Sequence, residues 1–311
     1  MTGVTAAPRP AGDTGRLSGG LLFGLGAYGL WGVFPAFFDL LSPAGAVEIL
    51  AHRVLWTVMF MALLLMAVGR VGDLRAITPR TWLLLAFASA LISANWLIYI
   101  YAVNADHVVD AALGYFITPL VSVVLGIAVF GERLNRAQGV ALLIAASAVV
   151  LLSTAASGKP LIGIGLAVSF GIYGAVKKVV PTDPRVSLSV ETAIAAPFAV
   201  AYLVVHQIGG NSEFLANGIG HAALMILCGP VTAIPLLFFG AAAQRLPLVT
   251  LGLLQYTTPS LQLAWGILAG HEPMPPARWI GFALIWIALA IFSADALSRA
   301  YRARTGTLHP S

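Results

Sequence analysis

The feature that most constrains this chain is a series of long apolar segments joined by short connectors. An α-helix needs about 20 mainly apolar residues to cross the hydrocarbon core of a bilayer. Only 9% of the residues are charged, against about 25% in a soluble domain, so charge cannot cover a globular surface of this size. The sequence predicts an all-α membrane protein with ten transmembrane helices, at approximately 18–40, 46–68, 81–103, 109–130, 137–156, 161–180, 187–207, 220–242, 247–270 and 277–297.

The basic residues of the connectors predict how these helices are oriented. Lys and Arg concentrate in the cytoplasmic loops of membrane proteins. Fourteen of the 17 basic residues fall on one side, only Lys159 and Arg278 fall on the other, and Arg53 lies within the second segment. We therefore expect both termini to be cytoplasmic, as an even number of crossings requires. The fourteen are Arg9, Arg16, Arg70, Arg75, Arg80, Arg133, Arg136, Lys177, Lys178, Arg185, Arg245, Arg299, Arg302 and Arg304.

An internal repeat divides the chain into two halves. Segment Ala102–Leu134 aligns without gaps to Ala242–Met274, and shorter matches precede it in each half. Each half holds five helices, an odd number, so the second copy must enter the membrane upside down. Inverted repeats of this kind are a transporter design, in which two halves rock about a site at the midplane. The matched positions include Thr118-Pro119 with Thr258-Pro259, Glu132 with Glu272, and Glu48 with Glu191.

The repeat predicts four parts of the chain. We expect a cytoplasmic tail at 1–17, a first five-helix repeat at 18–156, an inverted second repeat at 157–297 and a cytoplasmic tail at 298–311. The apolar run that follows Arg16 is too long for a signal-peptide core of about 7–15 residues.

Several other functions are not supported by the residues. The basic residues form no patch for nucleic acid, and the lone Cys228 excludes an internal disulfide. A glycine pattern at 24–29 matches the dinucleotide fingerprint but lies inside a membrane helix, and a zinc-protease-like string at His271 is broken by Pro275. We therefore predict no enzymatic site, no cofactor and no metal.

The residues also resemble a known family. Glu48 through Trp56 (EILAHRVLW), Asn95-Trp96, Gly131-Glu132-Arg133-Leu134 and Glu191-Thr192 are similar to the drug/metabolite transporter superfamily of EamA type, in its RarD subgroup of chloramphenicol-sensitive proteins. The resemblance covers roughly 19–295. It implies ten helices, a bacterial inner-membrane location and translocation of a small molecule, and it leaves the substrate open.

Three ionisable residues lie in the outer half of the second predicted helix. Such groups are costly in a membrane unless they are paired or face water, which makes them candidates for function. Glu48 and His52 are four residues apart and share a helical face, with Arg53 beside them. His52 and Arg53 could bind a carboxylate or zwitterion, and Glu48 could couple transport to protons. The alternative is that Glu48 only neutralises Arg53.

Two lysines end the sixth predicted helix and one acid begins the seventh. Lys177 and Lys178 could be anchors that reach the interface, but adjacent residues point to different faces, so one of them could face a cavity. Glu191 could pair with that lysine, either as a cytoplasmic gate or as a structural ion pair. Asp110 begins the fourth helix, where an acid favours the helix dipole.

Polar and aromatic residues near midplane are the remaining candidates for a substrate pocket. Asn95 and Tyr99 share a face of the third helix, Tyr115 lies in the fourth and Gln255 in the ninth. Pockets for small organic molecules combine apolar walls with a few polar groups. Interhelical packing is the alternative, and we favour it for the tryptophans.

These features predict a secondary transporter that exports small amphipathic metabolites or drugs by alternating access, with a small-molecule substrate and membrane lipid as its partners. We expect a monomer or homodimer. An intramembrane enzyme acting on lipid-linked substrates and a non-transporting scaffold are the alternatives, and neither needs two interconverting halves.

Overall fold

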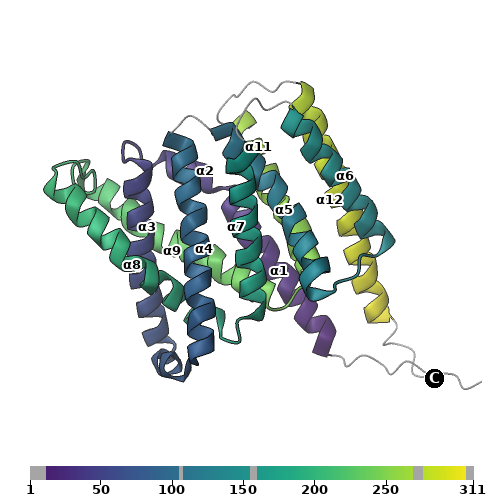
Figure 1. Ribbon diagram of the computed structural model, residues 1–311, viewed down its shortest axis with the longest axis horizontal. Coiled ribbons are helices and arrows are strands. Elements are labelled where there is room, and N and C mark those ends of the chain that lie inside the picture. The colour runs from purple at the N-terminus through teal and green to yellow at the C-terminus, as the bar shows by residue number, and fades with distance from the viewer. Residues whose placement is uncertain (1–11, 105–107, 155–159, 269–275, 306–311) are drawn as a thin grey trace, which may run out of the picture.

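The computed structural model of the protein is a bundle of helices, described over residues 12–104, 108–154, 160–268 and 276–305 (Figure 1). No strand occurs in the described residues. The elements are α1 (Gly12–Gly32), α2 (Phe34–Asp39), α3 (Ala46–Ala67), η1 (Val71–Ala76), α4 (Pro79–Asn104), α5 (Val108–Phe130), α6 (Arg136–Thr154), α7 (Pro160–Val179), α8 (Pro184–Ile208), α9 (Gly218–Ala243), α10 (Leu248–Gln255), α11 (Thr257–Leu268) and α12 (Pro276–Thr305).

The protein is an all-α membrane protein. Each predicted apolar segment falls on helical residues, and seven helices of the described chain are long and apolar enough to cross a bilayer. The surface carries exposed large side chains such as Leu22, Leu143 and Ile208, which are 72%, 70% and 81% exposed. Such a surface suits lipid rather than water. The count of ten crossings stays a prediction.

Two predicted segments are each divided by a break in the helix. The first breaks at Val33, two residues before Pro35, and the ninth breaks at Tyr256, three residues before Pro259. Proline lacks an amide hydrogen and clashes with the preceding turn, so a break just before it has a physical cause. Prolines at 119, 197 and 235 lie inside continuous helices.

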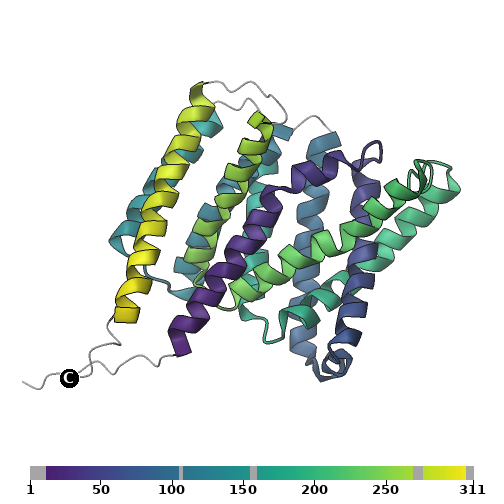
Figure 2. The same ribbon diagram turned by 180° about the vertical axis from the view of Figure 1, so that it is seen from behind.

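The helix ends also differ from the predicted tails. Helix α1 begins at Gly12, inside the tail expected at 1–17, and α12 continues to Thr305, beyond the expected end at 297. Hydropathy marks only the part of a helix that suits hydrocarbon, whereas the hydrogen-bonded helix can continue into the interface. The start of α1 and the end of α12 lie at the same end of the bundle (Figures 1 and 2).

The helix contacts can be compared with the repeat that the sequence predicts. Helix α7 packs against α4 and α5, and its counterpart α1 packs against their counterparts α9, α10 and α11. Helices that correspond to each other also pair directly: α3 with α8, α5 with α10, and α6 with α12, which form one edge of the molecule (Figures 1 and 2). This exchange of pairs is the pattern expected from two repeats related by a two-fold axis.

Close packing between the halves depends on glycine at specific places. A Cβ atom on Gly229 of α9 would lie 2.5 Å from the backbone oxygen of Trp56 in α3, and Thr57 of α3 donates a hydrogen bond to the Gly229 carbonyl at 3.3 Å. Small residues permit such approach between membrane helices. Helices α3 and α9 are thereby held together beside the candidate site.

The N-terminus of α10 is capped by an acidic side chain that is distant in the sequence. The two carboxylate oxygens of Glu132, in the connector after α5, accept hydrogen bonds from the backbone N–H groups of Leu248 at 2.7 Å and Val249 at 2.8 Å. These N–H groups have no partner within their own helix, and negative charge is favourable at a helix N-terminus. Lys178 lies 3.3 Å from Glu132 and donates to the Leu246 carbonyl at 2.7 Å.

Candidate functional site

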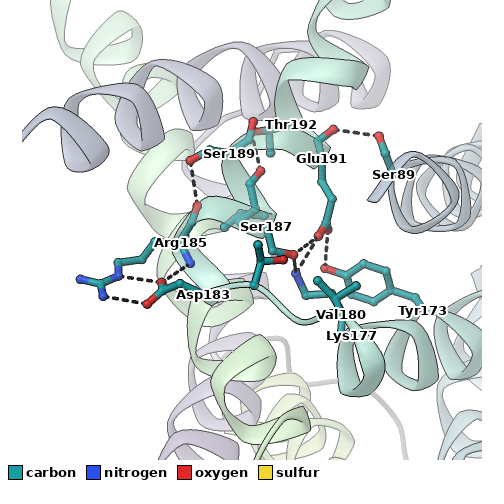
Figure 3. A network of polar contacts seen from close by, with 12 residues as sticks. Ser89, Tyr173, Lys177, Val180, Asp183, Arg185, Ser187, Ser189, Glu191 and Thr192 are labelled. Atoms are coloured by element: carbon teal, nitrogen blue, oxygen red, sulfur yellow. Dashed lines mark hydrogen bonds and ion pairs between the residues drawn. The ribbon is translucent and has the colours of Figure 1, made fainter. Parts of the chain in front are cut away.

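A buried ion pair joins α7 to α8 (Figure 3). Lys177 Nζ lies 2.6 Å from Glu191 Oε1 and donates to Ser187 Oγ at 2.5 Å. Ser187 donates to Glu191 Oε1 at 2.6 Å, and the Tyr173 hydroxyl donates to Glu191 Oε2 at 3.1 Å. We call these four residues, Tyr173, Lys177, Ser187 and Glu191, the inner cluster, after the predicted cytoplasmic side. The predicted pairing of Glu191 with one of the two lysines is confirmed, and Lys177 is that lysine.

The inner cluster is sealed from solvent and complete in its hydrogen bonds. The side chains of Lys177 and Glu191 are 1% and 2% exposed, and the carboxylate accepts three hydrogen bonds. The Glu191 backbone oxygen accepts a further bond from Ser89 of α4 at 2.8 Å. Charges buried in this way are tolerated only when they are paired and hydrogen-bonded. Lys177 is therefore no interfacial anchor.

A small cavity lies next to Glu191, between α3, α4, α7, α8 and α9. The cavity has a volume of about 10 Å³, which is room for about one water molecule. Pockets for metabolites measure about 300–1,000 Å³, so the helices are closed around this space. The lining residues are Val54, Ile92, Ser93, Trp96, Tyr173, Leu188, Glu191, Thr192, Ala195 and Leu236.

Glu48 lies at the opposite end of the α3–α8 pair, where it binds the connector between α8 and α9. Its Oε1 accepts hydrogen bonds from Ser212 Oγ at 3.0 Å and from the backbone N–H of Glu213 at 2.9 Å. Its Oε2 is buried without a hydrogen bond and lies 3.6 Å from His206 Nε2 of α8. Glu48 therefore joins α3 to the end of α8 and makes no ion pair with Arg53, in contrast to the alternative considered from the sequence.

Two further histidines near Glu48 each have one buried ring nitrogen without a hydrogen bond. His52 accepts a hydrogen bond from Trp56 Nε1 through Nδ1 at 3.1 Å and stacks on Phe214, while its Nε2 has no partner. His221 bonds the Leu41 carbonyl at 3.1 Å through Nε2, while its Nδ1 has none. We call Glu48, His52, His206, Ser212 and His221 the outer cluster. Among the described residues no group of acids, histidines and cysteines is arranged to hold a metal ion.

Arg53 lies between the two clusters and contacts aromatic rings. Its guanidinium carbon is 5.0 Å from the Trp96 ring centroid and 5.4 Å from that of Phe38, and its Nε donates to Thr232 Oγ1 at 3.1 Å. Trp96 also lines the small cavity. Trp96 packs against the apolar core, the role that we expected for the tryptophans, and it does so beside Arg53.

The other predicted pocket residues differ in their contacts. The rings of Tyr99 and Tyr115 contact each other, with centroids 6.0 Å apart, and both hydroxyls lie near enough to Arg53 to interact electrostatically. Asn95 instead donates to the Leu166 carbonyl at 2.9 Å and to Ser169 Oγ at 3.0 Å, which are packing contacts between α4 and α7. Gln255 is buried at the end of α10 and is not among the cavity-lining residues. The side chain of Asp110 lies outside the described residues.

Sequence reasoning missed Tyr173 and Ser187 of the inner cluster. A signal for them was present, because Tyr173 is four residues before Lys177 and Ser187 is four residues before Glu191. Residues at this spacing share a helical face. The contacts of Glu48 carry no such signal, because Ser212 lies in an irregular connector.

Ion pairs at the end of α3 and the start of α8, on the predicted cytoplasmic side, lie closer to solvent. Asp183 caps α8, accepts from the Arg185 backbone N–H at 2.9 Å, and pairs with the side chains of Arg185 and Arg70. The hydrogen bond from the Arg185 side chain, followed by the backbone bond and the two positive charges, lowers the pKa of Asp183 to about 2. The carboxylate therefore stays charged throughout the physiological pH range.

Known proteins resemble this chain over nearly its whole length. A model of the EamA-like transporter family matches residues 18–154. The protein RarD of Streptomyces exfoliatus is 50% identical over 287 residues, which cover 92% of this chain and 91% of that protein. RarD of Escherichia coli K12 is 39% identical, with 92% and 97% covered, and the uncharacterized transporter YojE of Bacillus subtilis is 39% identical, with 88% and 93% covered.

A solved crystal structure of a protein has the same fold. It superposes with a TM-score of 0.70 at 20% sequence identity and covers 90% of this chain and 99% of its own. At this identity the likeness concerns the fold alone.

Proposed function

This chain belongs to the EamA-like transporter family, as a RarD-type member of the drug/metabolite transporter superfamily, and from that premise we propose that it exports small amphipathic organic molecules by alternating access. It is a multi-pass membrane transporter. The proposal concerns the substrate, the direction, the bacterial inner membrane as its site, and a mechanism in which two inverted halves open a central cavity to either side in turn.

The observation that carries the proposal is a closed cavity inside the bundle, with polar contacts at both ends of two helices that line it. Helices α3 and α8 pack against each other, with Glu48 and His206 at one end and Arg70 and Asp183 at the other. The inner cluster and Trp96 lie between these ends and line or adjoin the cavity. A transporter needs such a closure on each side of its site, and it must open only one at a time.

The two closures suggest which contacts change during transport. Opening toward the cytoplasm would separate α7 from α8, and with them Lys177 from Glu191. Opening toward the outside would release Glu48 from the connector that holds Ser212 and Glu213. Protonation of Glu48 would remove the charge that accepts these hydrogen bonds, which gives protons a route to couple with transport, and His52 in the next turn of α3 is a second group that could take up the proton. Lys178 would take part through its pair with Glu132.

The first experiment is release of labelled compounds from proteoliposomes with and without a pH gradient. The panel contains neutral and aromatic amino acids, chloramphenicol and phosphorylated metabolites. Selective release establishes transport, and stimulation by the gradient supports proton coupling. Release no faster than from empty liposomes, by protein shown to be folded, would contradict transport of this panel and favour an enzyme or scaffold.

A reversible cross-link tests alternating access itself. Glu48 Oε1 and Ser212 Oγ lie 3.0 Å apart, so cysteines at both positions, in a background with Cys228→Ala, should be within reach of a short bis-methanethiosulfonate reagent that bridges the outer closure through two reducible disulfides. We expect the cross-linked protein to stop transport and a reductant to restore it. The matched control has only one of the two cysteines. Transport that continues through the cross-linked protein would exclude outward opening at this point.

A further inference from the structure

Arg53 places a positive charge inside the bundle. It lies about two turns into α3. None of the ion pairs between described residues includes it. Among the described residues, two acids are buried and both are engaged elsewhere, Glu48 with the outer connector and Glu191 with Lys177.

The guanidinium also retains hydrogen-bonding capacity. An arginine side chain carries five N–H donors in a planar fork. Only Nε of Arg53 is used in a hydrogen bond between described residues, to Thr232. The two terminal nitrogens are the ones that bind a carboxylate in the bidentate geometry, and no described residue occupies them.

Aromatic side chains from separate helices surround this charge. Phe38 of α2 and Trp96 of α4 lie against the guanidinium, and the contacting pair of Tyr99 and Tyr115 lies nearby. Together they form apolar walls around one cationic group. Trp96 belongs both to these walls and to the small cavity, so an opening of the cavity at Trp96 would expose Arg53 to it.

We propose that Arg53 receives the carboxylate of the transported molecule, and that the substrates are small organic anions with an apolar or aromatic body. The inference rests on the proposed transport function and names its substrate class. A cationic substrate would meet the positive charge of Arg53 at close range, and a neutral one would leave that charge unbalanced. A carboxylate supplies both the missing charge and the acceptors for the terminal nitrogens.

A purely structural role for Arg53 makes a different prediction. Cation–π contacts with two rings stabilise the protein without any ligand. In that case Arg53 substitutions lower stability but do not change which molecules bind. The measurement must therefore compare ligands that differ only in charge.

The test measures thermal unfolding of the purified full chain in detergent with 3-phenylpropionate, 3-phenylpropionamide, 2-phenylethylammonium or inorganic phosphate. We expect only 3-phenylpropionate to raise the midpoint. Arg53→Gln should weaken this binding at least about tenfold, because the carboxylate loses a charge-assisted hydrogen bond. Arg53→Lys keeps the positive charge and should weaken the binding less. Arg245→Gln is the matched control, because Arg245 also lies over an aromatic ring, 5.1 Å from the Phe23 centroid.

Each other outcome would overturn the inference. If 3-phenylpropionamide stabilises the protein as much as 3-phenylpropionate does, the site does not recognise the negative charge. If inorganic phosphate does so, the aromatic walls do not select for the apolar part of the ligand. If Arg53→Lys and Arg53→Gln both bind 3-phenylpropionate as tightly as the parent, Arg53 is not part of the binding site. If Arg53→Gln does not fold, the comparison between Arg53→Lys and the parent provides the test. The protein could bind no carboxylate and yet release neutral compounds from proteoliposomes. That outcome would overturn the inference about the substrate class but would still support the transport function.

Discussion

The inner and outer clusters each contain a buried glutamate, but they differ in how far their polar atoms are hydrogen-bonded. In the inner cluster, Lys177 and Glu191 neutralise each other, and the carboxylate accepts three hydrogen bonds. In the outer cluster, Glu48 Oε2, His52 Nε2 and His221 Nδ1 are buried without hydrogen bonds. An unpaired buried polar atom costs about 1–3 kcal/mol, so the outer arrangement is the less stable of the two.

This difference assigns different roles to the two closures. A fully satisfied ion pair stabilises one arrangement of α7 and α8 and resists opening until something replaces its contacts. Polar atoms without a hydrogen bond can gain a proton or a water molecule when the helices move apart. Opening at the outer cluster should therefore cost less free energy than opening at the inner cluster. We therefore expect the outer closure to respond to pH and the inner closure to determine stability.

The largest expected effect comes from Lys177→Met. The change leaves Glu191 charged and buried without its partner, which is expected to lower the free energy of unfolding by about 3–5 kcal/mol. The double variant Lys177→Met/Glu191→Gln removes both charges and should recover much of this loss. Chemical unfolding in detergent measures both. Lys178→Met is the control, because Lys178 is half-buried and its loss should be smaller. A Lys177→Met protein as stable as the parent would contradict the comparison.

A smaller effect is expected from Glu48→Gln in the outer cluster. The glutamine loses the charged acceptor for Ser212 and for the Glu213 N–H, which should cost about 1–2 kcal/mol of stability. Because a glutamine cannot take up a proton, stimulation of transport by a pH gradient should also be lost. Flux with and without the gradient measures this.

Glu213→Gln serves as the control for Glu48→Gln, since it changes a neighbouring carboxylate whose side chain bonds Asn217 instead. We expect it to keep the gradient response. If Glu48→Gln keeps it too, Glu48 does not carry the proton, and His52, His206 and His221 become the candidates.

The helices were predictable from the sequence because hydrocarbon demands apolar length, and a helix is the simplest way for such a segment to satisfy its backbone. The pairing of Glu191 with a lysine was predictable for a related reason, since buried charges must be neutralised. The breaks at Val33 and Tyr256 were not predicted as breaks. Proline inside a membrane segment permits a kink, a break or a continuous helix, and the packing around it decides which.

The candidate pocket was less predictable than the fold. For Asn95 the sequence left binding and packing open, and the structure uses its amide nitrogen for packing against α7. For Glu48 the sequence suggested a contact with Arg53 along the same helix, whereas the observed partners lie in the connector after α8. Which side chains converge depends on helix rotation and on irregular connectors, and neither has a periodic signature.

A third prediction concerns the cap on α10, which joins the halves at the inner end. Glu132→Gln keeps the size of the side chain but removes the charge that faces the N–H groups of Leu248 and Val249. Loss of a cap costs about 1 kcal/mol, so we expect that loss in the free energy of unfolding. Arg133→Gln, at the exposed neighbouring position, should change stability little. Equal effects of the two would show that the cap adds nothing to the inner closure.

The smallest expected effect lies where the inner end meets water. Asp183 has a pKa of about 2 in the folded protein, below its ordinary value of 3.8. The folded state therefore binds the proton less readily than the unfolded state, so the pairing of Asp183 stabilises the protein above about pH 4 and loses its effect as the pH falls toward 2. Because its arginine partners are 38% exposed, the effect should stay below about 1 kcal/mol. The difference in stability between the parent and Asp183→Asn should be constant at neutral pH and vanish near pH 2. A difference that instead grows on acidification would mean that folding raises the pKa of Asp183, and it would contradict a stabilising pairing of its carboxylate with Arg70 and Arg185.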